Sequence, residues 1–123
     1  VGILCLWHNF SVFFYCYTLH LITCVLQVFC QSLSFRIQKL PMAYAGRFVA
    51  ENEGGTGICK VLVGEQYGEV LGVHMLGNPC SEIIYGACMA IEQEMTLKEM
   101  EEVVFPHPTV SEIFKETVFA FGE

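Results

Sequence analysis

The sequence predicts an α+β fold, in which an antiparallel sheet with a β-hairpin is covered by three C-terminal helices. Three observations lead to this prediction. Residues 35–42 alternate apolar and polar side chains with the period of a half-buried strand. Two further apolar runs, 58–63 and 69–76, flank a glycine-bearing turn, which is typical of a hairpin. After residue 77 the apolar residues recur at helical spacing instead.

The connections within the sheet follow from proline and glycine. Pro41 ends the first strand or marks it as an edge strand. Residues 43–50 are expected to form an irregular connection, and residues 51–57 a glycine-rich loop. Gly72 lies inside the third strand, so it predicts either a β-bulge or the close approach of another backbone.

The first helix is predicted over residues 80–95. Asn78 is its expected N-cap and Pro79 its first residue, because proline suits a position whose N–H has no partner within the helix. Apolar residues at helical spacing would face the sheet: Ile83, Ile84, Ala87, Cys88, Ala90 and Ile91.

Two shorter helices follow, each announced by a capping box. Thr96 and Glu99 open a helix that ends near Glu102. Thr109 and Glu112 are expected to open the last helix, which runs to about residue 120.

Charge divides the chain into two parts. The 123 residues carry a formal net charge of −7, which argues against a nucleic-acid partner. All 6 basic and 13 acidic residues lie from Arg36 onward, and every acid is a glutamate. We therefore treat residues 35–123 as a globular domain and residues 1–34 as a separate, uncharged apolar segment.

Three interpretations of residues 1–34 are open. The segment is long enough to span a bilayer, and Arg36 and Lys39 follow it. Its lack of any helical or strand period instead favours out-of-frame sequence, such as a frameshift artefact. A buried hairpin is the third interpretation. A signal peptide is disfavoured because the run is too long and has no basic start.

The seven cysteines show neither a C-x-x-C pair nor the spacing of a metal site. Reduced, mostly buried thiols are the simplest interpretation. A stand-alone metal or redox protein that uses these cysteines is kept as a further hypothesis. No metal ligand is predicted.

The candidate site lies where His107 is held between Pro106 and Pro108. Proline restricts its own backbone and that of the preceding residue, so this histidine has little freedom. Glu112 follows five residues later, close enough to orient the ring for proton transfer near neutral pH. The alternative is purely structural: Glu112 caps a helix and His107 fills a turn.

Two motifs in this order resemble a known family. Residues 71–77 (LGVHMLG) are followed by a helix rich in small residues and then by residues 107–112 (HPTVSE). This combination resembles the C-terminal dimerisation domain of the FAD-dependent pyridine nucleotide–disulfide oxidoreductases, dihydrolipoamide dehydrogenase in particular. Glutathione and mercuric reductases share the domain, so it could also come from a related disulfide or mercuric reductase.

The resemblance implies a mechanism. His107, oriented by Glu112, would reach across a two-fold interface and take a proton from the dihydrolipoamide thiol. The resulting thiolate attacks a redox disulfide, and electrons pass through FAD to NAD. Residues 35–123 would form a homodimer in a redox-active flavoprotein that serves cell redox homeostasis. Its further partners would be lipoyl-bearing 2-oxoacid dehydrogenase or glycine cleavage components.

The sequence departs from the family in what it lacks. It has no G-x-G-x-x-G for FAD or NAD and no cysteine pair of the family's type. No cofactor-binding residue is expected beyond backbone near His107 and Pro108, and the chain alone is expected to be inactive. We expect a cytoplasmic protein, with membrane association only if residues 3–30 insert. The alternative is a non-catalytic dimerisation module, membrane-tethered in that case.

Overall fold

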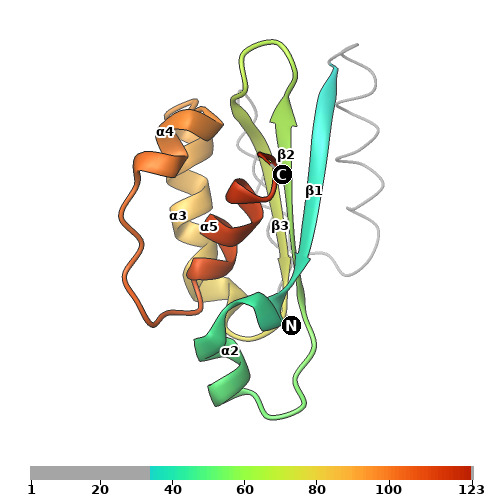
Figure 1. The fold of residues 1–123 in the computed structure, drawn as a ribbon, viewed down its shortest axis with the longest axis vertical. Helices are drawn as coiled ribbons and strands as arrows, with labels where there is room; N and C mark the ends of the chain where they lie inside the picture. Colours follow the sequence, from blue (N-terminus) through green and yellow to red (C-terminus); the bar gives the residue numbers. More distant parts are fainter. Residues whose placement is uncertain (1–33, 123) are drawn as a thin grey trace.

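The computed structural model describes residues 34–122, and these form an antiparallel sheet covered on one face by helices. The interpretations of residues 1–33 as a membrane segment, out-of-frame sequence or hairpin lie outside this part. The sheet has the order β1-β2-β3, with β1 at Phe35–Pro41, β2 at Ile58–Gly64 and β3 at Val70–Leu76. Figure 1 shows the helices α3, α4 and α5 on one side of it. The predicted fold class is confirmed.

The three strands pair as their sequence periods predict. Both pairs are antiparallel, with Phe35 opposite Gly64 at one end and Ile58 opposite Leu76 at the other. The register of β2 and β3 shifts between Leu62 and Val63, so Leu71 is an extra residue beside Gly72. Gly72 therefore marks a β-bulge, and among residues 34–122 no backbone approaches it: an added Cβ would meet only Leu62 Cδ1 there, at 3.8 Å.

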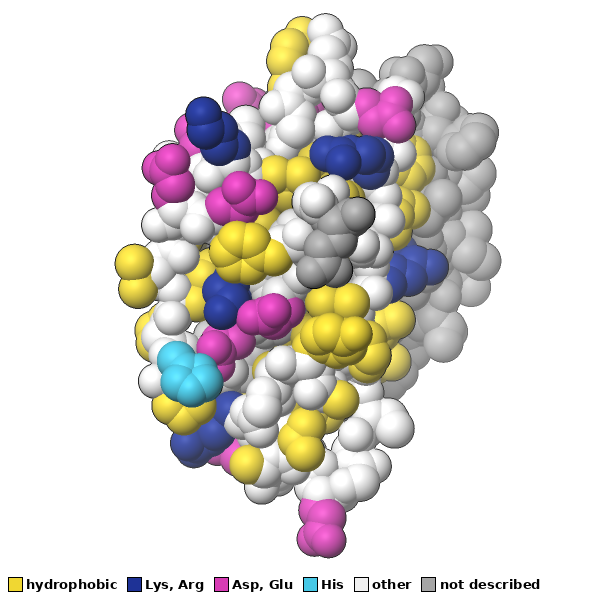
Figure 2. Space-filling view, in the orientation of Figure 1, with side chains coloured by type: hydrophobic (Ala, Val, Ile, Leu, Met, Phe, Trp, Pro, Cys, Tyr) yellow, Lys and Arg dark blue, Asp and Glu magenta, His cyan; other side chains and the backbone are white. Residues whose placement is uncertain are grey.

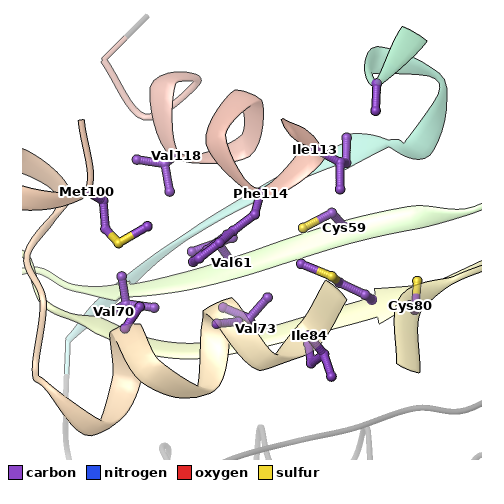
Figure 3. Packing of buried hydrophobic residues seen from close by; sticks show 14 of the residues in the cluster. Cys59, Val61, Val70, Val73, Cys80, Ile84, Met100, Ile113, Phe114 and Val118 are labelled. Atoms are coloured by element: carbon purple, nitrogen blue, oxygen red, sulfur yellow. The ribbon is translucent and has the colours of Figure 1, made fainter. Parts of the chain in front are cut away.

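The core lies between the sheet and the helices α3 (Cys80–Glu92) and α5 (Glu112–Phe119). Figure 3 shows Phe114 and Ile113 pointing from α5 toward β2, and Ile84 on α3 close to Val73 of β3. Ile113 and Phe114 are at most 3% exposed. Thr117 and Val118, four residues further on, are buried as well, so α5 is fixed by burial more than by its length of eight residues.

The C-terminal end of α5 is attached to β1 by polar groups. Gln38 Nε2 donates to the carbonyl of Ala120 at 2.6 Å. The guanidinium of Arg36 lies 5.4 Å from the ring centroid of Phe121. The strand thus holds the last turn of the helix whose first turn carries the candidate site.

The prediction of an irregular connection over residues 43–50 is wrong. A 3-10 turn, η1 (Met42–Tyr44), and a helix, α2 (Gly46–Glu51), occupy it. Phe48 is only 2% exposed and Met42 is fully buried, so tertiary burial stabilises a helix of six residues that would not persist alone.

The N-terminus of α3 also differs from the prediction. The helix begins at Cys80 after Pro79, and no side chain caps it. Asn78 instead turns toward Asn52, whose Nδ2 donates to the Asn78 carbonyl at 3.4 Å. The helix ends at Glu92 rather than residue 95, because Glu94 takes a left-handed conformation with φ 52°.

The second helix, α4 (Leu97–Glu102), begins as predicted. The Thr96 side chain accepts from the Glu99 N–H, and the Thr96 N–H donates to Glu99 Oε2 at 2.8 Å. Both arms of the capping box are therefore present. Among residues 34–122, no helix is long and apolar enough to cross a membrane.

Candidate functional site

His107 and Glu112 meet as the sequence predicted. His107 Nδ1 lies 2.9 Å from Glu112 Oε1. The histidine side chain is 80% exposed, whereas that of the glutamate is 11% exposed. The pair therefore joins a carboxylate held inside the domain to an imidazole that faces outward.

The second oxygen of the carboxylate is used by the backbone. The Thr109 N–H donates to Glu112 Oε2 at 2.9 Å. This is one arm of the capping box predicted for α5, so Glu112 both caps the turn and binds the imidazole. The two interpretations of Glu112 describe one side chain, because each of its oxygens has its own partner.

The other hydrogen bond of the predicted capping box is not formed. The Thr109 hydroxyl donates to the Pro106 carbonyl at 2.7 Å and lies 2.9 Å from Ser111 Oγ, so it does not cap α5. The helix begins at Glu112, and Ser111 precedes it without a side-chain cap. The threonine hydroxyl closes the turn that carries His107.

The electrostatics of the site favour an ionised Glu112. The Thr109 amide, then the His107 ring, hold the pKa of the Glu112 carboxyl below its usual value, while desolvation opposes them; the charges of His107 and Lys115 lower this pKa further. An ionised carboxylate has no proton to donate, so His107 Nδ1 must carry the hydrogen of their bond. In the neutral ring, Nε2 is then the free base.

Lys115 is the member of the site that sequence reasoning missed. Its Nζ lies 3.9 Å from Glu112 Oε1 and 3.0 Å from Glu116 Oε1. The three-residue spacing to Glu112 within a helix was the available signal, since residues three apart share a helix face. Figure 2 shows a histidine at the surface with acidic and basic side chains beside it.

The other histidine that the structure describes lies elsewhere. His74 is in β3, 6% exposed, and faces away from α3 and α5, next to Lys60 of β2. Its Nδ1 has no hydrogen-bond partner within the described residues. His74 therefore does not belong to the site formed by His107 and Glu112.

The described cysteines do not contribute to the site. Cys59 and Cys80 are buried and Cys88 is half-buried, and all three are free thiols. Burial raises the pKa of Cys59 to about 12 and that of Cys80 to about 11. Residues 34–122 contain no group of three side chains that could hold a metal ion.

Comparison with known proteins supplies the family context. Residues 27–118 match the model of the pyridine nucleotide-disulphide oxidoreductase dimerisation domain, a match that begins before the boundary expected at residue 35. The chain is 40% identical over 88 residues to a dihydrolipoyl dehydrogenase of Rhizobium etli, covering 71% of this chain and 18% of that protein. It is 36% identical over 91 residues to the enzyme of Zymomonas mobilis, covering 73% and 19%. The chain thus spans about a fifth of the curated relatives it matches.

Solved structures share the fold. LpdA of Mycobacterium tuberculosis matches with a TM-score of 0.67 at 20% identity, covering 79% of this chain and 21% of that one. The HOCl-induced flavoprotein disulfide reductase RclA of Escherichia coli matches with a TM-score of 0.68 at 22% identity, covering 76% and 21%. At these identities the likeness concerns the arrangement of strands and helices.

Proposed function

This chain belongs to the family of pyridine nucleotide-disulphide oxidoreductase dimerisation domains, and from that premise we propose that it serves a dihydrolipoyl dehydrogenase by supplying His107 as acid/base to the partner subunit's active site. The observation that carries the proposal is the hydrogen bond of 2.9 Å between His107 Nδ1 and Glu112 Oε1. It orients an exposed imidazole with Nε2 directed away from its carboxylate.

The chemistry asked of His107 is one proton transfer. The thiol of dihydrolipoamide loses its proton to Nε2, so an S–H bond breaks, an N–H bond forms and a thiolate remains. Glu112 stabilises the imidazolium that results and keeps hydrogen on Nδ1 in the neutral ring. This step requires no oxidant from the chain itself.

The rest of the reaction is assigned to groups outside residues 34–122. The sheet here is antiparallel throughout, whereas a dinucleotide-binding unit needs parallel strands joined by a helix. The described sheet is therefore not such a unit, and we propose that the FAD and NAD domains lie outside it. A backbone contact to a cofactor near His107 and Pro108 stays a prediction.

We likewise assign the redox disulfide to groups outside residues 34–122. The buried thiols of Cys59 and Cys80 have raised pKa values, which makes them poor nucleophiles. Among residues 34–122 no reactive thiol accompanies this exposed base, which supports a site shared between subunits, in which His107 is one half.

A second copy of the chain is proposed to dock on α3. Tyr85 and Met89 are 68% and 46% exposed and lie four residues apart on the helix, so they share one face. Gly86 lies between them in sequence, and an added Cβ there would meet nothing within 4 Å. A face with two large apolar side chains and an open position permits close packing of a second helix.

The remaining assignments follow from the same proposal. Lipoyl-bearing 2-oxoacid dehydrogenase or glycine cleavage components would be the further partners, in the cytoplasm. The second candidate is a dimerisation module without catalysis, or the same domain in another disulfide or mercuric reductase. The bond from the Thr109 N–H to Glu112 supports that candidate, because it gives Oε2 of the carboxylate a structural role that needs no catalysis.

A chimera tests the proposal. Residues 35–122 would replace the corresponding domain of the Rhizobium etli dihydrolipoyl dehydrogenase, with and without His107→Gln. We expect the substitution to abolish dihydrolipoamide oxidation while flavin content and dimer remain. Val104→Ala, at an 89% exposed position of the same loop, is the control and should keep full turnover. Near-normal turnover of the His107→Gln chimera would refute the acid/base role.

A further inference from the structure

Lys115 lies one helical turn beyond Glu112, on the same face of α5. Its ammonium lies between two carboxylates, 3.0 Å from Glu116 Oε1 and 3.9 Å from Glu112 Oε1. The Lys115 side chain is 28% exposed, so much of its length is covered by the domain. A chain of charges thus runs from His107 through Glu112 and Lys115 to Glu116.

We propose that Lys115 is a positioning residue for the His107–Glu112 pair: held by Glu116, it keeps the Glu112 carboxylate ionised, with Oε1 toward the imidazole and Oε2 toward the Thr109 amide. The part that Lys115 plays in proton transfer rests on the proposed function. The contacts that hold Glu112 in place involve only residues of this chain.

The Glu112 carboxylate has little contact with water. Its side chain is 11% exposed, so water screens and stabilises its charge little. Oε2 has the Thr109 amide at 2.9 Å. On Oε1 the imidazole supplies a hydrogen bond, and Lys115 adds a positive charge that stays beside the carboxylate when the ring is neutral.

The charge state of Glu112 decides where the substrate proton goes. If Glu112 were protonated, it could donate to Nδ1, and the neutral ring would then carry its hydrogen on Nε2, which could not accept the thiol proton. A nearby ammonium disfavours protonation of Glu112. Consistent with this, Lys115 contributes to the lowered pKa of that carboxyl, after the Thr109 amide and His107. A proton arriving from a thiol then goes to Nε2.

Glu116 is the second carboxylate beside Lys115. Its Oε1 lies closer to the ammonium than Glu112 does, so it sets where Lys115 is held. The Lys115 ammonium is too far from Glu112 Oε1, at 3.9 Å, to form a direct hydrogen bond with it. This oxygen of Glu112 therefore stays available to the His107 imidazole. The two glutamates therefore have different tasks toward one lysine.

Nuclear magnetic resonance on the full chain tests the inference without an activity assay. In Lys115→Gln we expect the Thr109 amide to exchange its hydrogen about twofold to fivefold faster, because a partly exposed ion pair is lost from its acceptor. The ¹⁵N shifts of the His107 ring should show a larger share of the Nε2–H tautomer. Lys115→Arg should restore both signals, since it keeps the charge.

Other amides separate positioning from general helix stabilisation. The Phe114 amide donates to the Ser111 carbonyl at 3.0 Å and the Ala120 amide to the Glu116 carbonyl at 3.0 Å. Neither should change if Lys115 acts on Glu112 alone. An unchanged Thr109 amide in Lys115→Gln, or equal acceleration of the Phe114 and Ala120 amides, would overturn the inference.

Failure of the inference can be told apart from failure of the proposed function. If His107→Gln abolishes turnover of the chimera while Lys115→Gln leaves the Thr109 amide and the tautomer unchanged, only the role of Lys115 is wrong. If His107→Gln keeps turnover, the proposed function is wrong, and the resonance data still decide whether Lys115 holds the carboxylate.

Discussion

Phe105 stands edge-on to Phe114, with ring centroids 6.2 Å apart and ring planes at 82°. Phe114 is 3% exposed in the core, and Phe105 packs partly buried against the same cluster. The contact joins the extended segment before His107 to the helix after it. The histidine loop is therefore fixed on one side by this ring pair and on the other by the two bonds of Glu112.

Phe105→Leu should loosen that loop. We expect the free energy of unfolding to fall by about 1 kcal/mol, because an edge-to-face ring pair contributes about 0.5–1.5 kcal/mol beyond the area it buries. Urea unfolding monitored by circular dichroism measures it. Val104→Ala, next to it and 89% exposed, should change the unfolding free energy by less than about 0.5 kcal/mol. Equal effects of the two substitutions would show that the ring pair does not anchor the loop.

Glu112→Ala should destabilise the domain in a pH-dependent way. Loss of its hydrogen bonds is expected to cost about 1–2 kcal/mol near neutral pH. The pKa of this carboxyl is lowered in the folded state, by the Thr109 amide first and the His107 ring second. Its stabilisation is therefore present above the unfolded-state pKa and is lost as pH falls through the folded-state pKa.

The measurement is urea unfolding of wild type and variant at a series of pH values. The difference in unfolding free energy found at about pH 5 should shrink as pH falls below about 4, where glutamate protonates in the unfolded chain. Glu53→Ala, in the loop before β2, is the control. A difference that grows on acidification would contradict the sign argued here.

The strand β1 could be predicted from its two-residue alternation, and β2 and β3 from two apolar runs on either side of a glycine-bearing turn. The helix α2 could not, since its six residues carry no cap and depend on Phe48 entering the core. Asn78 shows the same limit. Its position before Pro79 is that of an N-cap, yet Asn52, far away in sequence, interacts with it.

The pairing of His107 with Glu112 could be predicted from the sequence because the two residues are five apart with a proline turn between them. The division of labour between the two carboxylate oxygens was not, because it depends on the path of the turn. Thr109 illustrates this: its hydroxyl bonds back to the Pro106 carbonyl, so only its amide remains for Glu112. Local motif rules assign both groups to the helix and miss the turn.

Met89→Glu should weaken self-association if α3 is the face between subunits. A buried glutamate without a partner disfavours an interface strongly, so we expect the dissociation constant of the dimer to rise at least tenfold. Sedimentation velocity over a range of concentrations measures it. Tyr67→Glu, at a 71% exposed position in the hairpin turn, introduces the same charge away from α3 and should leave association unchanged. Equal association of wild type and Met89→Glu would exclude this face.

Cys59 should resist alkylation in the folded chain. Burial raises the pKa of its thiol to about 12 from the ordinary 9.0, with the Thr117 side chain partly opposing that rise and Cys80 adding to it. At pH 8 the thiolate fraction then falls from roughly one in ten to roughly one in ten thousand, so iodoacetamide should react about a thousandfold more slowly. Peptide mass spectrometry after timed labelling measures this site separately, with Cys88, half-buried on α3, as the internal control. Labelling in urea should remove the difference, because the cause is burial.

Rapid labelling of Cys59 under native conditions would mean that the core opens, and would return this thiol to the set of groups that could exchange protons or electrons with His107. Slow labelling would exclude Cys59 as a nucleophile for that histidine, in agreement with a site shared with a second polypeptide.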